Sequence, residues 1–307
     1  MDLINIKFDE QKNVFEKIKP ITENYKFSCS TGKSAYSSND FELKMPYQLG
    51  NALLEIGDLV MYGNTEFGGI ISHRTIDTRS NEVTYSGHSL RGYVSHQTVR
   101  NDDSETRNVV SHIGRIMGLV QLGITSIINN SSYEAFAFTN VPFAKQTDTL
   151  DSLVNCIDSV YTFYIENGKF NILINPKTTH KFDASQVDMV FDENHSRAYV
   201  VFAYNPKTFE YSGEKLPSAP PLFLKLEKAV ESDKETAAEL YEVAKKEFSK
   251  ERTTISSDIF SNLKKAEVGD NVIASILEIG LKITKTVVEK SIKIVNGNAE
   301  ITYTLEG

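Results

Sequence analysis

Residues 57–71 read GDLVMYGNTEFGGII, and residues 269–283 read GDNVIASILEIGLKI. In this ungapped alignment a Gly-Asp pair opens both stretches and a Glu-x-Gly turn follows in both. After a short insertion, residues 82–85 (EVTY) match residues 300–303 (EITY). Gly-Asp turns are common and apolar residues interchange freely, but agreement at several special positions exceeds what turn chemistry requires. We therefore predict a duplicated β meander, with a first copy at 57–85 and a second copy at 269–303.

The residues before the first copy alternate between apolar and polar, which is typical of half-buried strands. Phe27 and Cys29 alternate with polar neighbours, as do Phe41 and Leu43, and residues 30–40 form a loop or wide hairpin. Cys29 is in step with Phe27, so we expect a buried, unreactive thiol. Further strands are expected at 58–62, 69–76 and 82–85.

The middle of the chain changes to helical spacing. Residues 102–104 (DDS) are a helix-start signal, apolar residues recur at helical spacing from 109 to 120, and Gly123 is the expected C-cap. Gly114 and Gly118 lie four residues apart on this helix, which favours close packing against another helix. The segment is therefore expected to be a core helix.

A second helix is expected from Thr147 or Thr149 to Val160, followed by a hairpin at Asn167-Gly168. Asn-Gly is the preferred pair for a type I′ turn, because both positions need positive φ. The two-residue loop pairs Glu166 with Lys169, Ile165 with Phe170, Phe163 with Ile172, and Tyr161 with Ile174.

The last third contains strands, a linker and a helix. Residues 198–204 are the most apolar strand, residues 216–221 hold three prolines and form a stiff linker, and residues 222–250 form a long, charge-laced helix. Its mixed charges argue against a calmodulin-target or membrane helix. A second type I′ hairpin at 296–297 pairs Ile294 with Ala299 and Ile292 with Ile301.

Composition narrows the class of protein. The chain has 307 residues and a net charge of −8, which allows two or three domains and argues against tight duplex DNA binding. Its 2 cysteines, Cys29 and Cys156, exclude a disulfide scaffold, and we expect both in the core. No apolar run approaches ~20 residues, so no membrane span is expected. The start MDLINIKFDE lacks a secretion signal, which favours synthesis in a cytoplasm.

No motif carries recognisable catalytic or ligand chemistry. Residues 30–34 (STGKS) suggest a phosphate-binding loop, but Phe27 stands where its first glycine belongs, so we expect a flexible polar loop. A Ser–His pair within residues 87–92 lacks a nucleophile elbow, and nothing in the sequence pairs any two carboxylates. The histidines show no zinc-ligand spacing and are expected to be structural: His73, His88, His96, His112, His180 and His195. We therefore predict no catalytic, cofactor-binding or metal-binding residues, no cofactor and no enzymatic activity.

Residues 38–100 resemble a known family. The stretches that carry the resemblance are DFEL (40–43), GDLV (57–60), EFGGII (66–71) and VTYSGHSLRGY (83–93). They resemble the N-terminal domain of phage tail hub proteins, the baseplate hub and tail-associated proteins that cap the tail tube. In that family a strand ends in G-x-S-x-R-G before the chain leaves toward an α/β insert. Residues 268–272 resemble the family's last domain.

The resemblance implies a homotrimer. Three chains with two tube-like β-barrels each would form a ring of six similar units, which docks on a sixfold tail tube and offers threefold symmetry to a spike or fibre protein. DNA would pass transiently through the lumen without stable nucleic-acid binding. Larger relatives carry peptidoglycan-cleaving or fibre domains after the last strand. Because this chain stops at Gly307, a separate partner is expected to supply them.

The sequence thus predicts a β-rich α+β fold: two related tube-like β-barrel domains, residues 1–102 and 187–307, bracket a mixed α/β insert at 103–186, with a long helix near 222–250. The predicted function is a structural hub at the distal end of a phage or prophage tail, located in the virion tail and synthesised in a host bacterial cytoplasm. Two alternatives stay open. One is a cell-wall (peptidoglycan) hydrolase using carboxylates of the insert, and the other is a receptor- or carbohydrate-binding tail module with exposed tyrosines.

Overall fold

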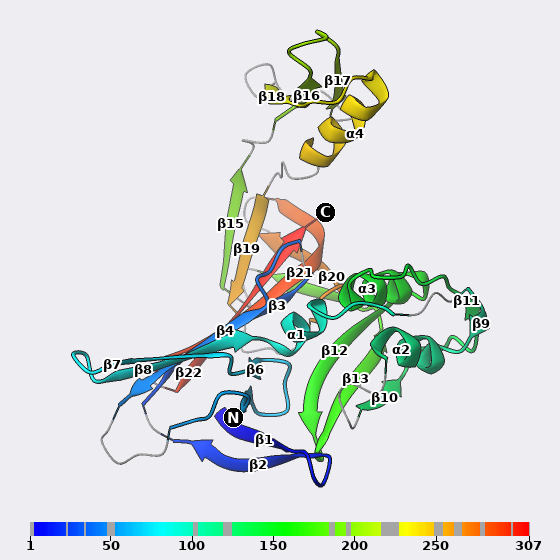
Figure 1. Ribbon diagram of the computed structural model, residues 1–307. Coiled ribbons are helices and arrows are strands. Elements are labelled where there is room, and N and C mark those ends of the chain that lie inside the picture. Colours follow the sequence, from blue (N-terminus) through cyan, green and yellow to red (C-terminus); the bar gives the residue numbers. More distant parts are fainter. Residues whose placement is uncertain are drawn as a thin grey trace. The chain divides into compact units, whose positions relative to one another are not determined.

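A computed structural model gives the fold of the chain (Figure 1). It describes residues 3–22, 24–33, 35–47, 53–100, 104–118, 125–183, 188–194, 198–215, 227–248, 254–260, 266–276, 280–295 and 297–306. The chain divides into two compact units, residues 1–189 with 258–307 and residues 190–257. The division into domains 1–102, 103–186 and 187–307 stays a prediction.

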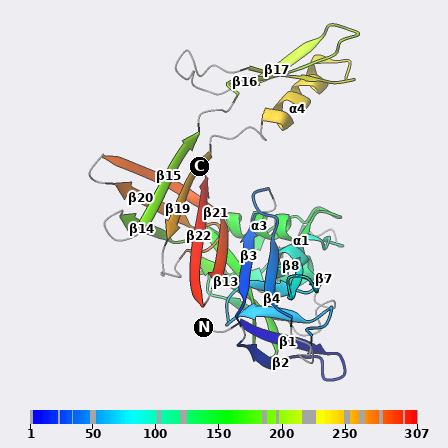
Figure 2. The same ribbon diagram turned by 90° about the vertical axis from the view of Figure 1, so that its left-hand side faces the viewer.

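The largest sheet of the first unit has eight strands in the order β14-β20-β21-β3-β4-β8-β7, with β22 paired to β21. The strands are β3 (Lys26–Gly32), β4 (Asp40–Pro46), β7 (His73–Asp77), β8 (Glu82–His88), β14 (Thr179–Asp183), β20 (Asn271–Ile276), β21 (Leu281–Val295) and β22 (Asn298–Glu306). Strands from both ends of the chain thus share one sheet. Figure 2 shows the blue β3 and β4 beside the red and orange β22 and β21.

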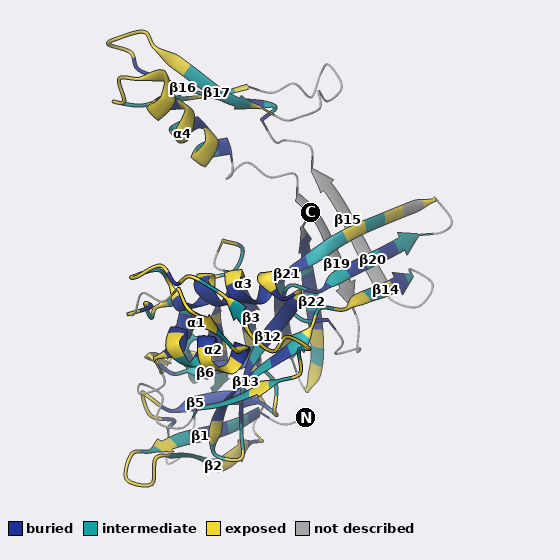
Figure 3. Ribbon diagram, turned by 90° about the vertical axis from the view of Figure 1, so that its right-hand side faces the viewer, coloured by how far each residue is buried: buried dark blue, intermediate teal, exposed yellow. Residues whose placement is uncertain are grey.

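Smaller elements of the first unit pack around one core. A sheet β2-β1-β5-β6 and a sheet β10-β13-β12 contribute apolar residues to it, together with three helices and the short pair β9–β11 (Figure 3). The elements are β1 (Leu3–Asp9), β2 (Val14–Ile21), β5 (Leu59–Tyr62), β6 (Gly68–Ile70), α1 (Leu90–Ser95), β9 (Thr106–Arg107), α2 (Val109–Met117), β10 (Thr125–Asn129), β11 (Phe136–Ala137), α3 (Gln146–Cys156), β12 (Ser159–Glu166) and β13 (Lys169–Pro176).

The two predicted barrels are not confirmed, because no sheet formed by the described residues closes. The hairpin β3–β4 lies between the two copies instead: β4 pairs with β8 of the first copy, and β3 pairs with β21 of the second. The strand predicted at 69–76 is also two strands, β6 and β7, in different sheets. Strand periodicity identifies which face of a strand is buried, and it does not identify the neighbouring strand.

Both predicted hairpins are confirmed in their register. In β12–β13, Glu166 lies opposite Lys169 and Tyr161 opposite Ile174, with Asn167 at φ 53° and Gly168 at φ 72°. In β21–β22, Ile294 lies opposite Ala299 and Ile292 opposite Ile301. The turn residues fix these registers locally.

The predicted ends of the first helix are wrong. Helix α2 begins after Asn108, whose side chain accepts the Ser111 amide at 2.8 Å, and it ends at Gly118, which has φ 54°. Gly118 therefore caps the helix instead of packing against another one, and nothing lies within 4 Å of a Cβ built on it. Asp102, Asp103 and Gly123, the caps that the sequence predicted, lie outside the described residues.

The second helix is shorter than predicted. Helix α3 begins after Lys145, which makes no side-chain cap, and it ends at Cys156. Val160 belongs to strand β12. Cys156 is exposed, so its predicted burial is wrong, whereas Cys29 is buried as predicted. Burial raises the pKa of the Cys29 thiol to about 12, which keeps it protonated and unreactive at neutral pH.

The second unit is a small sheet with one helix. Its sheet has the order β17-β16-β18, and α4 packs on β16 and β17. The strands β15 and β19, which precede and follow it in the chain, pair only with each other among the described strands. These elements are β15 (Asp188–Asn194), β16 (Val200–Tyr204), β17 (Tyr211–Lys215), β18 (Glu227–Glu231), α4 (Ala237–Phe248) and β19 (Thr254–Phe260).

The long helix predicted at 222–250 is not confirmed. Residues 227–231 form β18, which pairs parallel to β16, and α4 begins only after a capping box. The Thr236 hydroxyl donates to the Glu239 carboxylate at 2.8 Å, while the Glu239 amide donates back to the Thr236 hydroxyl at 3.3 Å. This Thr-x-x-Glu signal is present in the sequence and marks the true helix start. No helix among the described residues is long and apolar enough to cross a membrane.

Candidate functional site

The glycines of the G-x-S-x-R-G stretch bring three elements into contact. A Cβ on Gly87 would collide with the Ile70 carbonyl oxygen of β6, and one on Gly92 would collide with the Asn39 carbonyl oxygen before β4. Between them, Ser89 is the N-cap of α1, and its hydroxyl accepts the Gly92 amide at 3.2 Å. The stretch that carried the family resemblance is therefore a packing junction.

Arg91 joins this junction to the helical part of the unit. Its side chain is buried, and its guanidinium donates to the Tyr161 hydroxyl at 2.9 Å and to the Tyr161 carbonyl at 3.1 Å. It lies 4.2 Å from the Tyr161 ring centroid and 3.5 Å from Asp151. Burial would lower the pKa of Arg91, but Tyr161 and Asp151 outweigh it and hold that pKa above its ordinary value. The buried cation is thus compensated by its partners.

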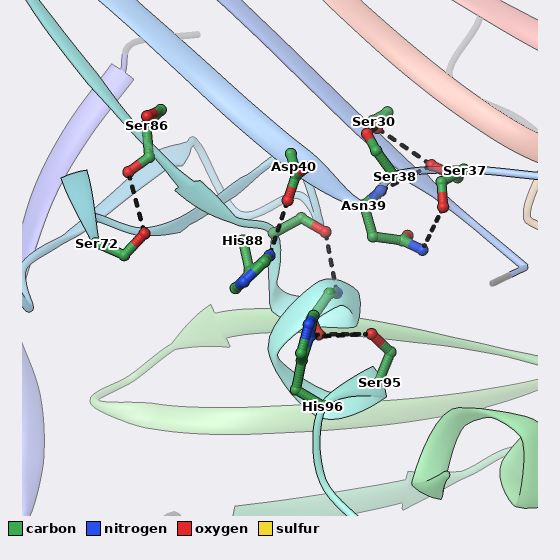
Figure 4. Close-up of polar contacts among 12 residues, drawn as sticks. Ser30, Ser37, Ser38, Asn39, Asp40, Ser72, Ser86, His88, Ser95 and His96 are labelled. Carbon is green, nitrogen blue, oxygen red and sulfur yellow. Dashed lines mark hydrogen bonds and ion pairs between the residues drawn. The ribbon is translucent and has the colours of Figure 1, made fainter.

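His88 and His96 lie beside each other at the same junction (Figure 4). Their ring centroids are 4.2 Å apart, and His88 Nδ1 lies 2.8 Å from the Asp40 carboxylate. His96 Nδ1 lies 2.8 Å from the Gly92 carbonyl oxygen. The serine of the Ser–His pair considered at 87–92, Ser89, serves as a helix cap. The nearby Ser95 hydroxyl donates to the Gly92 carbonyl at 2.7 Å and lies 3.5 Å from His96 Nδ1.

Side-chain hydrogen bonds connect the described residues of the loop from β3 to β4 (Figure 4), whose flexibility stays a prediction. Asn39 Oδ1 accepts the Gly32 amide at 2.7 Å, and the Ser37 hydroxyl donates to Ser30 Oγ at 3.1 Å. Ser30 to Gly32 belong to β3, and Ser34 lies outside the described residues. The loop joins two strands, so it is not a phosphate-binding loop before a helix.

The buried His112 and the exposed His73 both have hydrogen-bond partners. His112 is fully buried, donates from Nε2 to the Phe136 carbonyl at 3.0 Å, and lies against Phe138. His73 Nε2 lies 3.1 Å from the Thr75 hydroxyl. His195 lies outside the described residues. Within the described part of the chain, no three His, Cys, Asp or Glu side chains gather as metal ligands.

The repeated Gly-Asp turns have the same geometry in both copies. Gly57 and Gly269 have φ 94° and 105°, so both require glycine. Gly57 donates to the Ile71 carbonyl and Gly269 to the Val287 carbonyl, each at 2.8 Å. Val287 is therefore the counterpart of Ile71, instead of the Ile283 of the ungapped alignment. The copies differ in strand length: β20 and β21 are longer than β5 and β6, which the alignment without gaps could not show.

A buried aspartate follows each turn glycine and binds a neighbouring segment. Asp58 accepts the Asn5 side-chain amide at 3.1 Å and the Glu55 amide at 3.2 Å. Asp270 makes the corresponding bond to the Glu267 amide at 2.8 Å. It also accepts the Thr178 amide at 2.8 Å and lies 3.0 Å from His180 Nε2. His180, too, is thus a structural histidine.

A buried ion cluster that the sequence analysis missed joins the two copies. Lys290 of β21 is only 5% exposed, and its ammonium contacts Glu66 of the first copy and, at 2.5 Å, Glu267 beside the second turn. Burial would lower the pKa of Lys290, but the two carboxylates outweigh it and raise that pKa. The signal in the sequence is a lysine in phase with the buried Val288 and Ile292 of one strand.

The ion cluster lines a cleft of about 230 Å³ within the first unit, together with Phe67, Tyr164 and Tyr303. A pair of carboxylates in a cleft is one requirement of a glycosidase. Here a single buried ammonium lies between them, and burial, partly offset by Lys290, raises the pKa of Glu267. The arrangement holds Glu66 and Glu267 together as an ion pair network, which is a structural role.

The comparisons with known proteins concern the fold. No protein-family model matches the sequence, and no curated protein matches it. Solved structures do match over nearly the whole chain. A prophage MuSo2 43 kDa tail protein from Shewanella oneidensis shares 11% identity over 99% of this chain and 96% of its own, with a TM-score of 0.55.

Two further tail proteins match equally broadly. Prophage tail protein gp18 from Listeria monocytogenes shares 15% identity over 99% of this chain and 94% of its own. A tail protein from Neisseria meningitidis shares 13% identity over 100% of this chain and 97% of its own. Both have a TM-score of 0.51. This chain therefore has the fold of prophage tail proteins, which confirms at the level of the fold the resemblance seen in residues 38–100.

Proposed function

We propose that this chain is a structural protein of a phage or phage-like tail and acts as the hub at the distal end of the tail tube. The observation that carries the proposal is the match of 99–100% of the chain to three prophage tail proteins. The match extends through both meander copies and the segment between them. Such full coverage favours a role of the whole chain in a tail over a role of one borrowed domain.

The duplication supports a homotrimeric ring. Each chain holds two copies of one meander with the same turn geometry, so three chains offer six similar units to a sixfold tube and threefold symmetry to a spike or fibre. In this proposal domains 1–102 and 187–307 contribute the strands of the shared sheet other than β14, which comes from domain 103–186. Domain 103–186 contributes the sheet β10-β13-β12 with α2 and α3.

The charge supports passage of DNA without retention. A net charge of −8 disfavours stable contacts with phosphates, so DNA would cross the lumen of the ring without being held. The protein would be made in the bacterial cytoplasm and reside in the virion tail. The side chain of Ser89 caps a helix, His88 packs against His96, and Glu267 forms an ion pair with Lys290. These contacts favour a role without catalysis.

The experiment is light scattering and cryo-electron microscopy of the purified full-length chain, alone and mixed with tubes of a phage tail-tube protein. The expected result is a particle of three times the 34.4 kDa chain mass, a ring with an open channel, and binding to tube ends. A chain that stays monomeric and does not bind to tube ends would contradict the proposed hub function.

The hydrolase alternative has its own readout. Purified peptidoglycan is incubated with the wild-type chain, with the Glu134→Gln and Asp151→Asn variants of the 103–186 segment, and with the Glu66→Gln and Glu267→Gln variants of the cleft. The hub predicts no released muropeptides in any sample. Release by the wild type that any of these variants abolishes would overturn the proposal in favour of a cell-wall hydrolase.

A further inference from the structure

The small sheet of the second unit has one face packed against a helix and one face that displays aromatic side chains. In β16 the buried Val201 and Ala203 pack against residues of α4 (Figure 3). Phe202 and Tyr204 lie on the opposite face, because successive residues of a strand point to opposite sides of the sheet. Tyr211 of β17 lies opposite Tyr204 and joins them there. Tyr204 is 37% exposed and Tyr211 is 68% exposed.

The loop that joins β16 to β17 adds a fourth aromatic ring. Phe209 is 86% exposed and has φ 60°, a left-handed conformation that costs a residue with a side chain about 1–2 kcal/mol. The buried Asn205 holds the loop in this shape, since its Oδ1 accepts the Lys207 amide at 2.8 Å and its Nδ2 donates to the Lys234 carbonyl at 2.9 Å. The Phe209 amide also donates to the Asn205 carbonyl at 2.9 Å. A strained backbone that fixes an apolar ring in solvent indicates a binding role.

These four rings line one open pocket of about 470 Å³. Its lining residues are Phe202, Tyr204, Asn205, Pro206, Phe209 and Tyr211, of which the four aromatic residues form the aromatic face. A Cβ built on Gly213 would lie 2.7 Å from Phe202 Cδ1, so glycine at this position leaves room for the Phe202 ring. The Phe202 and Tyr211 ring centroids are 6.3 Å apart with an interplanar angle of 74°. Rings that are already positioned need not be ordered when a ligand binds.

Polar groups border the aromatic face and restrict the chemistry of its ligand. The hydroxyls of Tyr204 and Tyr211 bond to no other described residue, and none of the described residues that line the pocket is charged. The exposed Glu231 of β18 lies opposite Tyr204, so its side chain is at the margin of the same face. A carboxylate there accepts hydrogen bonds and repels phosphate groups. The matching ligand is uncharged, has an apolar face and carries hydrogen-bond donors.

We propose that the aromatic face binds a neutral glycan. The C–H face of a sugar ring is apolar and packs on aromatic rings, while its hydroxyls donate to the two tyrosine oxygens and to Glu231. A single-stranded nucleic acid also stacks on aromatic rings, but it needs basic side chains along its backbone. A proline-rich peptide also docks in aromatic grooves, but proline has no N–H to donate to Glu231. The inference goes beyond the proposed hub and does not depend on it.

An array of neutral oligosaccharides tests the proposal with the full-length chain. The probes are hexasaccharides of glucose, galactose, mannose, rhamnose and N-acetylglucosamine, and titration calorimetry measures the affinity of each one that the array retains. The expected result is saturable binding of at least one hexasaccharide with a Kd below about 1 mM. Absence of binding to every probe overturns the proposal.

Substitutions with a matched control locate the site. Phe209→Ala and Tyr211→Ala should each weaken binding of the retained sugar by about tenfold or more, because each removes a stacking ring. The control is Phe143→Ala in the first unit, since Phe143 is 81% exposed and has φ 62°, which matches Phe209 in residue type, exposure and backbone. This control should leave the affinity unchanged, and circular dichroism checks that all three variants fold. Sugar binding that survives both Phe209→Ala and Tyr211→Ala overturns the assignment to this face.

Two further probes separate the other occupants of such a face. Decaproline and an oligothymidylate strand should bind the wild-type chain more weakly than the retained sugar. Tighter binding of either probe, lost in Phe209→Ala, overturns the glycan in favour of a peptide or a nucleic acid. The outcome is also separable from the hub: a trimer that binds tube ends but no glycan overturns only this inference, and a glycan-binding monomer overturns only the hub.

Discussion

The two Gly-Asp turns have nearly the same backbone and different partners. Asp58 receives Asn5 from β1, which runs antiparallel to β5, whereas Asp270 receives Thr178 and His180 beside β14, which runs parallel to β20. The turn therefore offers a buried carboxylate that accepts whichever donors the adjacent strand supplies. The local sequence determines the conformation of the turn, and the tertiary fold determines which donors bind its aspartate.

The strands that follow the turns differ more strongly. Arg74 of β7 and Lys290 of β21 occupy the same place opposite a tyrosine, Tyr85 and Tyr303 respectively. Arg74 is exposed, while Lys290 is buried between two carboxylates. The basic residue at this position of the repeat is thus exposed in the first copy, where Arg74 donates to the Leu54 carbonyl at 3.2 Å, and binds two carboxylates inside the second copy.

The largest predicted effect breaks the ion cluster. Lys290→Ala leaves the buried Glu66 and the partly buried Glu267 without their cation and should lower the free energy of unfolding by about 3–5 kcal/mol. Arg74→Ala at the matching position should change it by less than about 1 kcal/mol. Urea unfolding followed by circular dichroism measures both, and equal effects would contradict the buried role of Lys290.

The same cluster predicts a pH dependence. The folded-state pKa of Lys290 is raised above the ordinary value of 10.5, so its stabilising contribution is fully present below that pH and is lost as pH rises through the folded-state pKa. The loss of stability of the wild type above pH 10.5 should therefore be shallower in Lys290→Met. Parallel stability profiles for the two proteins would show that the ammonium contributes nothing.

Removal of the turn aspartates should give an intermediate effect. Asp270→Ala leaves the Thr178 and Glu267 amides without an acceptor and should cost about 3 kcal/mol. Asp58→Ala frees fewer donors and should cost about 2 kcal/mol. Thermal unfolding of both variants ranks their stabilities. A larger loss of stability in Asp58→Ala would mean that the hydrogen bonds of Asp58 stabilise the fold more than those of Asp270.

The smallest predicted difference concerns the turn glycines. Gly57→Ala and Gly269→Ala both force an L side chain to positive φ, at a cost of about 1 kcal/mol. At Gly269 the new Cβ would also lie 2.9 Å from Val160 Cγ1, whereas nothing lies within 4 Å at Gly57. Gly269→Ala should therefore be the more destabilised variant in urea, and an equal cost would show that Val160 moves away.

The features that sequence predicted correctly share a local cause. The hairpins at Asn167-Gly168 and in β21–β22 have the expected register because turn residues with positive φ fix it. Helix ends were predicted less well. Asn108 and the Thr236–Glu239 box carry the true start signals, but Asp102 and the charge pattern of 222–250 suggested longer helices. Competing cap residues cannot be ranked without the contacts of the helix they begin.

In the candidate site, too, local features were predicted from the sequence and contacts between distant residues were not. Cys29 is buried as predicted, and His112 and His180 make the hydrogen bonds of packed side chains, while the absence of catalytic and metal-binding residues stays a prediction. Cys156 was wrongly placed in the core, since a helix end leaves it exposed. The partnership of Glu66, Glu267 and Lys290 could not be predicted, because these residues are far apart in the chain.

The sequence by itself determined the turns, the hairpin registers and the duplication, because positive-φ glycines and strand alternation act over a few residues. Only the tertiary structure decided that β3–β4 joins both copies into one sheet, and that β3 covers β21 while no described strand covers the outer edge of β7. The physical reason is that a strand's backbone can hydrogen-bond to any other strand. Burial, ion pairing and the shape of the whole fold select which neighbour it receives.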